Sequence, residues 1–205
     1  MTLCGDAPTL HAKLAEAVRF KPSLVVSWGV CGGLDPRLRP GDLIFGAEVV
    51  SNGRVVRTDE AVTSSLAQRL GNAGARVFVE RVAFSDAPIV TAAAKAELRR
   101  ATGAAGVDME SLIAGQFALE HRIRFAILRA VADPAQRDLP PLALKAVNSD
   151  GGVDAAAIIK ELIRSPWQLA GLRTLAADSR AAFQALKRCR SLLPGFFLGL
   201  GAADV

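Results

Sequence analysis

Apolar and polar positions along this chain follow two patterns, one typical of buried strands and the other of amphipathic helices. Continuous or alternating apolar runs predict strands over residues 24–28, 43–50, 77–84 and 125–132, and a short strand that closes at Val107. Apolar residues spaced three and four apart predict helices over residues 9–20, 61–70, 91–100, 109–120, 155–163 and 165–189. Strands that alternate with helices indicate an α/β fold, in which a central twisted mixed sheet is flanked by helices.

Turn and capping residues mark where several of these elements begin. Asn52-Gly53 predicts a hairpin turn, and Thr91, Asp108 and Asp154 are placed to cap the helices that follow them. Ser165-Pro166-Trp167-Gln168 predicts a capping box that opens the last helix. We therefore expect a single domain over residues 1–164. Residues 165–205 would form a basic amphipathic helix and an apolar tail, packed on that domain or extending from it.

The composition excludes several classes of protein. The 205 residues are 51% hydrophobic and 22% charged, which is typical of a globular domain. Three scattered cysteines argue against a disulfide scaffold and for a reducing, cytoplasmic location. The two histidines lack metal-ligand spacing, so no metal site is expected. No opening signal peptide and no apolar run long enough to span a membrane is apparent.

The net charge of +5 raises the question of an anionic partner. Basic and aromatic residues do not interleave, which argues against nucleic acid. Arg173, Arg180 and Lys187 recur at seven-residue spacing on the last predicted helix, and Phe196-Phe197 follow in the tail. This pattern would suit peripheral contact with an anionic membrane surface at its inner face. The alternative is a helix packed on the body, with its arginines solvated.

Three segments carry candidate chemistry. The first, Ser27–Leu34, is rich in glycine and follows an apolar strand. Glycines there let backbone N–H groups converge on an anion, although a tight strand-to-loop turn explains them equally well. The segment matches neither the dinucleotide-binding fingerprint nor the Walker pattern. Cys31 within it is interpreted as a small buried thiol rather than a nucleophile.

The other two segments each contribute a carboxylate. Glu110 is placed in the first turn of a helix, where the helix dipole favours its ionised form. Ordinary capping chemistry explains it as well. Asp133 ends an apolar strand, where burial would raise its pKa and suit it to donate a proton. A turn aspartate before Pro134 is the alternative. One charged and one protonated carboxylate is the division of roles that acid catalysis on a bound substrate requires.

These motifs resemble the purine nucleoside phosphorylase and nucleosidase superfamily. The resemblance lies in Gly29–Leu34 with Gly41–Leu43, in Val107–Glu110 and in Ala132-Asp133. It is closest to the hopanoid-biosynthesis-associated nucleoside phosphorylases, where it continues through residues 133–141, 150–151 and 178–183 and covers most of the chain.

The resemblance implies a pentosyltransferase that uses inorganic phosphate as co-substrate, needs no cofactor, and releases adenine from adenosylhopane. It implies that Asp133 protonates the purine N7 and that Glu110 holds the ribose 2′- and 3′-hydroxyls. The remaining implied contacts are Met109 against the sugar, Pro88 and Ile89 along the base, and Gly29, Val30 and Gly32 facing phosphate or another nucleophile. The expected partners are a nucleoside substrate, which the resemblance implies is lipid-linked, and further copies of the chain in a homo-oligomer.

The sequence departs from the family pattern at three places. Val30 stands where many relatives carry a serine, and Ala132 replaces the serine that often precedes the aspartate. Residues 3–6 correspond to a later point in the family, so we expect a domain that lacks the family's N-terminal strand. These departures leave two alternatives: a nucleosidase that uses water, and a truncated nucleoside-binding protein without catalysis.

Overall fold

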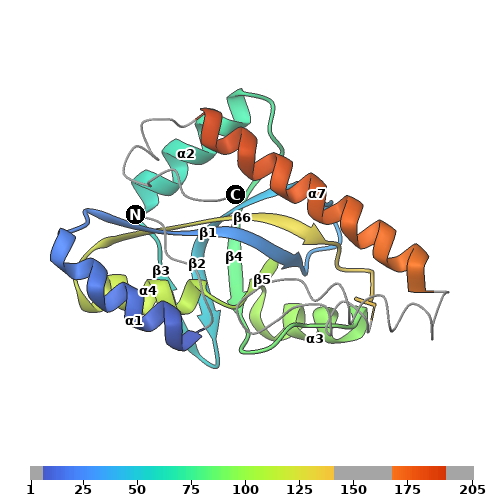
Figure 1. Cartoon of the computed structure of the whole chain (residues 1–205), viewed down its shortest axis with the longest axis horizontal. Helices are drawn as coiled ribbons and strands as arrows, with labels where there is room; N and C mark the ends of the chain where they lie inside the picture. The colour runs from blue at the N-terminus through green and yellow to red at the C-terminus, as the bar shows by residue number, and fades with distance from the viewer. Residues whose placement is uncertain (1–6, 141–167, 193–205) are drawn as a thin grey trace.

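The computed structural model describes residues 7–140 and 168–192, and their elements alternate as the apolar pattern predicts (Figure 1). The helices are α1 (Ala7–Ala17), η1 (Val18–Phe20), α2 (Glu60–Asn72), α3 (Ala92–Thr102), α4 (Ser111–Glu120) and α7 (Gln168–Leu192). The strands are β1 (Leu24–Gly33), β2 (Leu43–Ser51), β3 (Arg54–Arg57), β4 (Val77–Phe84), β5 (Gly106–Asp108) and β6 (Arg124–Asp133). The cap at Asp154, the helix over 155–163, residues 165–167 of the capping box and the tail lie outside the described residues.

The six strands form one mixed sheet in the order β3-β2-β4-β5-β1-β6. The sheet also closes on itself, because β2 pairs antiparallel with β6 through Leu43–Ala130, Ile44–Arg129 and Phe45–Leu128. On its other edge β6 runs parallel to β1. Strand β6 is therefore held on both sides, and Figure 1 shows it crossing the centre of the molecule between α7 and α4.

Alternate residues of β6 face two different cores, as the period of a strand requires. Phe125, Ile127 and Val131 lie in a cluster that the sheet forms with α4. Leu128 and Ala130 face a second cluster, built with α2 and α7, to which α7 contributes Ala182, Leu186 and Cys189. Strand β6 thus contributes to two cores, one shared with α4 and the other with α2 and α7. None of the described helices is both long enough and apolar enough to cross a membrane.

The local sequence signals are confirmed at several points. Thr91 caps α3 by accepting from the Ala94 backbone N–H. Asn52 and Gly53 adopt positive φ values of 46° and 77° in the hairpin between β2 and β3. The predicted strand over 77–84 has the bounds expected for it, whereas the last helix runs on to Leu192 instead of ending near Cys189.

Two expectations about element ends are wrong. The helix expected from Met109 begins at Ser111, because Asp108 accepts from the backbone N–H of Ser111 and so sets the first turn there. The glycine segment, residues 29–33, is not a turn but the second half of β1. Its glycines allow close contact with β6: a Cβ at Gly29 would lie 2.7 Å from Arg129 Nη1, and one at Gly33 would lie 3.0 Å from the Asp133 carbonyl oxygen.

Candidate active site

A buried arginine organises the first part of the site. Arg129 lies in the middle of β6 and is almost wholly buried. Its Nε lies 2.7 Å from Asp108 Oδ2, and its Nη2 donates to Ser27 Oγ at 2.6 Å. Nη2 also donates to Ser111 Oγ at 3.2 Å. Because a buried charge is costly unless it is paired, these contacts hold the guanidinium in one place.

Glu110 is the exposed member of this cluster. Its Oε2 lies 3.1 Å from Arg129 Nη1, and its side chain is 45% exposed, against 4% for Arg129. Glu110 occupies the N-cap position of α4 but makes no capping hydrogen bond. Asp108 takes that role by accepting from the N–H groups of Glu110 and Ser111 at 3.1 and 2.9 Å. Glu110 is therefore a carboxylate that contacts Arg129 on its buried side and is accessible to a ligand on its exposed side.

Asp133 forms the second part of the site, at the end of β6. Its Oδ2 pairs with Nζ of Lys95, a fully buried residue of α3. The same ammonium donates to the carbonyl oxygens of Pro134 at 3.0 Å and Arg137 at 2.9 Å. An ammonium has three donors, and all three are used here. Lys95 therefore fixes both the carboxylate and the loop that follows it.

Burial raises the pKa of Asp133 above its ordinary value. The hydrogen bond and charge of Lys95 act in the opposite direction and lower that pKa. The charge of Asp178 raises the pKa further, while that of Arg137 lowers it. Desolvation is the largest of these effects, so the carboxyl group is easier to protonate than an exposed aspartate.

Helix α3 connects the end of β6 to the loop that follows β1. One turn after Lys95, Arg99 donates through Nη2 to Asp35 Oδ2 at 2.7 Å. Asp35 lies in the loop after β1, and Arg37 also donates to it. The hydrogen bonds from Arg37, together with the charges of Arg99 and Arg37, lower the pKa of Asp35 to about 2. The loops after β1 and β6 are thus fastened to one helix, which fixes their separation.

The two parts of the site lie close together around β1. Gly29 pairs with Arg129 and Gly32 with Asp133, with a register shift between Cys31 and Gly32. A Cβ at Gly32 would lie 3.3 Å from Val107 and 3.4 Å from Asp133 Oδ1. Burial raises the pKa of the Cys31 thiol, which Asp108 and Asp133 raise further and Arg129 lowers. Cys31 therefore lies within the electrostatic reach of both parts, as an inert buried thiol.

The remaining predicted site residues occupy the surroundings of this centre. Met109 is 40% exposed beside Glu110. Pro88 is exposed in the loop before α3, whereas Ile89 packs against the cluster that contains Leu34 and Val107. That loop is joined to the segment after Asp133, because Leu139 N–H donates to the Val90 carbonyl oxygen at 2.8 Å.

The glycine segment presents backbone rather than side chains to the site. The side chain of Val30 packs with Leu43 and Leu128 in the core that β6 shares with α2 and α7. Its carbonyl oxygen accepts from Arg129 Nη1 at 3.3 Å. Any contact between Val30 and a nucleophile is therefore confined to the backbone. The absence of a Cβ at Gly29 and Gly32 leaves room for Arg129 and the Asp133 carboxylate.

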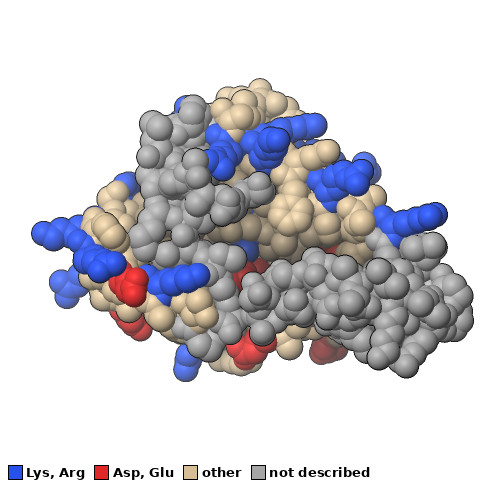
Figure 2. Space-filling view, viewed as in Figure 1, with Lys and Arg blue, Asp and Glu red and all other residues tan. Residues whose placement is uncertain are grey.

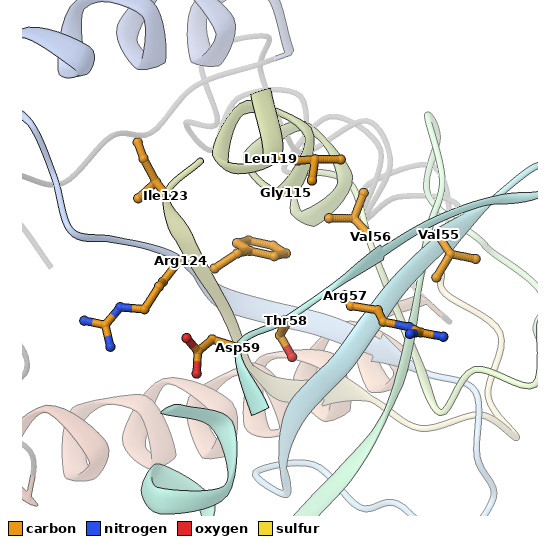
Figure 3. A pocket seen from close by; sticks show the side chains of 10 residues that line it. Val55, Val56, Arg57, Thr58, Asp59, Gly115, Leu119, Ile123 and Arg124 are labelled. Atoms are coloured by element: carbon orange, nitrogen blue, oxygen red, sulfur yellow. The ribbon is translucent and has the colours of Figure 1, made fainter. Parts of the chain in front are cut away.

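A separate pocket of about 330 Å³ lies at the other end of β6 (Figure 3). Its walls are Val55, Val56, Gly115, Leu119, Ile123 and Phe125, with Arg57, Thr58, Asp59 and Arg124 at the edges. It includes none of the predicted site residues. Among the described residues, no group of three histidine, cysteine or acidic side chains is arranged to hold a metal ion.

Sequence reasoning missed Lys95 and underrated Arg129. Lys95 is surrounded in sequence by alanines on a polar helix, so nothing local distinguishes it from a solvated lysine. Arg129 did carry a signal, because it interrupts an otherwise apolar strand. A charge in such a strand is buried and requires acidic partners, which here are Asp108 and Glu110.

Comparison with known proteins identifies a family and a set of similar folds. A family model described as the phosphorylase superfamily matches residues 4–164. No curated protein sequence gives a significant match.

Solved structures of similar fold include three bacterial proteins. The S-adenosylhomocysteine nucleosidase of Streptococcus pyogenes superposes with a TM-score of 0.64 at 16% identity, covering 97% of this chain and 77% of that one. The methylthioadenosine/S-adenosylhomocysteine nucleosidase of Campylobacter jejuni gives 0.60 at 17% identity, covering 91% and 77%. Futalosine hydrolase of Helicobacter pylori gives 0.62 at 14% identity, covering 89% and 74%.

Proposed function

The chain belongs to the phosphorylase superfamily, and on that premise we propose that it cleaves the N-glycosidic bond of a purine nucleoside. The observation that carries the proposal is the pair of unlike carboxylates around β1 and β6. Glu110 is half exposed beside a buried arginine, whereas Asp133 is buried and has a raised pKa. Such a pair can hold a sugar with one member and protonate a leaving group with the other.

Glu110 is the proposed sugar-binding group. Its Oε2 lies 3.1 Å from Arg129 Nη1, and the oxygens of a carboxylate can accept hydrogen bonds from two neighbouring hydroxyls. Arg129 is itself held by Asp108 and Ser27, so the carboxylate is oriented before a substrate arrives. Met109 offers an apolar surface for the sugar ring.

Asp133 is the proposed general acid. Cleavage of a glycosidic bond passes through an oxocarbenium-like transition state, and protonation of the leaving group lowers the barrier. The proton of the Asp133 carboxyl would move to the purine N7 as the bond to the ribose carbon breaks, and the bonding electrons would leave with the base. Lys95 stabilises the carboxylate that remains.

Phosphate is the nucleophile that we propose, and an adenosine linked to a hopanoid through its 5′ position is the proposed substrate, both on the motifs shared with hopanoid-associated phosphorylases. Water is the second candidate nucleophile. It is favoured by the names of the similar structures, which are nucleosidases or a hydrolase. It is also favoured by Val30, whose side chain packs in the core and offers no hydroxyl for phosphate.

An adenine-release assay with adenosine and its 5′-substituted analogues tests the proposal. Ribose 1-phosphate formed only when phosphate is present supports phosphorolysis, whereas free ribose formed without phosphate supports hydrolysis. Asp133→Asn is expected to lower kcat by about 10²- to 10⁴-fold, the usual contribution of a general acid, with nucleoside binding retained. Glu60→Gln, on an exposed position of α2, is the matched control. If the wild-type chain binds these nucleosides but releases no adenine from them, it is a binding protein and the proposal is wrong.

A further inference from the structure

The outward face of α7 carries a concentration of positive charge. Five exposed cations lie on this helix: Arg173, Arg180, Lys187, Arg188 and Arg190. No acidic group of the described residues lies within ion-pair distance of any of them. Figure 2 shows the blue side chains following the line of α7, with no red among them on this face. Within the part of the chain that the structure describes, these charges therefore act together and are not neutralised locally.

The spacing of these cations makes the face linear. Arg173, Arg180 and Lys187 recur every seven residues, which returns close to the same side of a helix. They extend over about 21 Å along the helix axis. The opposite side of α7, with Ala182, Leu186 and Cys189, is buried against the sheet. The basic stripe, defined as Arg173, Arg180 and Lys187, thus faces away from the body of the protein.

Apolar side chains accompany the stripe. Phe183 is 52% exposed and Leu192 is 45% exposed, and both are large hydrophobic residues on the same helix. Gln184, Lys187, Arg188 and Ser191 line an open depression beside them, of about 410 Å³. Exposed cations together with exposed apolar side chains on one helix match the surface of an anionic bilayer, where headgroups meet acyl chains.

The inner side of the same helix reaches the candidate active site. Asp178 pairs with the guanidinium of Arg137, whose backbone carbonyl accepts from Lys95. The charge of Asp178 also contributes to the raised pKa of Asp133. A surface that contacts the stripe would therefore lie one helix away from the proposed acid.

We propose that the outer face of α7 docks the protein on an anionic lipid surface and so brings the active site to a nucleoside carried by a lipid. The part of this inference that concerns the substrate rests on the proposed function. The docking itself rests only on the charge, exposure and orientation of α7. A membrane-bound substrate would be reached by diffusion in two dimensions, and its nucleoside would project into the site beside the helix.

Vesicle sedimentation tests the docking. The full chain is mixed with phosphatidylcholine vesicles that contain or lack phosphatidylglycerol, at low and at physiological salt. Arg173→Gln/Arg180→Gln/Lys187→Gln is expected to weaken binding to the anionic vesicles by about a hundred-fold, since each basic residue near such a surface contributes roughly a factor of five.

The control, Arg54→Gln/Arg69→Gln/Arg100→Gln, removes the same charge from exposed sites elsewhere and is expected to bind within about three-fold of wild type. Phe183→Ser is expected to weaken binding in a manner that salt does not change.

The outcomes separate docking from catalysis. Adenine release from soluble adenosine is measured on the same proteins, and thermal unfolding confirms that each is folded. Vesicle binding that depends on the stripe supports the docking even where no adenine is released, a result that would refute only the proposed function. Adenine release without vesicle binding, or equal binding by the two triple variants, overturns the docking. So does a duplex oligonucleotide that binds through the stripe when vesicles do not.

Discussion

Lys95→Met breaks a buried ion pair and gives the sharpest test of how the site is held. Methionine matches the apolar stem of lysine but lacks the ammonium, so it removes the three hydrogen bonds to Asp133, Pro134 and Arg137. Because Lys95 is fully buried, water cannot replace those donors. Removal of one partner from a buried ion pair costs about 3–5 kcal/mol of unfolding free energy. We expect a loss of that size at about pH 8.

The loss is expected to depend on pH. Lys95 lowers the pKa of Asp133 through its hydrogen bond and its charge, and both effects disappear in the variant. The effect of burial, which raises this pKa, is then no longer opposed by lysine. A carboxyl group whose folded pKa exceeds its unfolded value binds more protons in the folded state, so stability is retained at low pH and falls as pH rises through the folded pKa. At a pH below its folded pKa, Asp133 in the variant is protonated and neutral. The remaining cost is then that of the unpaired carbonyls, about 1–3 kcal/mol.

Urea unfolding of wild type and variant at the two pH values measures this difference. The double variant Lys95→Met/Asp133→Asn removes both charges and is expected to recover at least half of the stability lost at the higher pH. Lys95→Met alone should remain folded enough to give a full transition at the lower pH. A loss that is the same at both pH values, or a double variant whose loss is the sum of the single ones, would refute a coupled ion pair.

Four further outcomes follow from the site. Glu110→Gln should lower kcat/KM for adenosine by about 10- to 100-fold and abolish discrimination against the 2′,3′-dideoxy analogue, because a charged hydrogen bond is worth about 1.5–3 kcal/mol; unchanged discrimination would remove Glu110 from sugar binding. Gly29→Ala places a Cβ 2.7 Å from Arg129 Nη1, and should lower unfolding free energy by about 1–3 kcal/mol in urea titrations. Cys31 should resist alkylation in the native protein at mildly alkaline pH and react once unfolded, since burial raises its thiol pKa; rapid native labelling would contradict its burial. The pKa of Asp35 is lowered from 3.8 to about 2, so its stabilising effect is present above the higher value and lost as pH falls to the lower one; acid unfolding of Asp35→Asn should lack that component.

The sequence predicted the frame of the molecule because its signals are local. A period of two, a Thr at an N-cap and an Asn-Gly turn each act within a few residues, so β4, the start of α3 and the β2–β3 hairpin were found from neighbouring residues alone. The fold class followed from the order of these elements, and the similarity to nucleosidase structures confirms it.

The partners within the site could not be predicted because they are distant in sequence. Lys95 and Asp133 are 38 residues apart, and the arginine beside Glu110 is contributed by another element. The glycine segment was interpreted as a turn because glycine commonly marks turns, yet here it allows β6 side chains to approach β1. Only the pairing of β1 with β6 explains why glycine is required there.

The order of synthesis gives the closed sheet a further consequence. Strand β6 pairs with β1, about a hundred residues earlier, and with β2. A ribosome releases residues in order, so β1 must wait with one neighbour missing until residues 124–133 have emerged. Arg129 and Asp133 arrive on that same strand, and a partly made chain therefore has neither the anchor for Glu110 nor the acid. The addition of β6 therefore completes the sheet and supplies both site residues in one late step. We expect a chaperone or a slow codon to have most effect while this strand is being made.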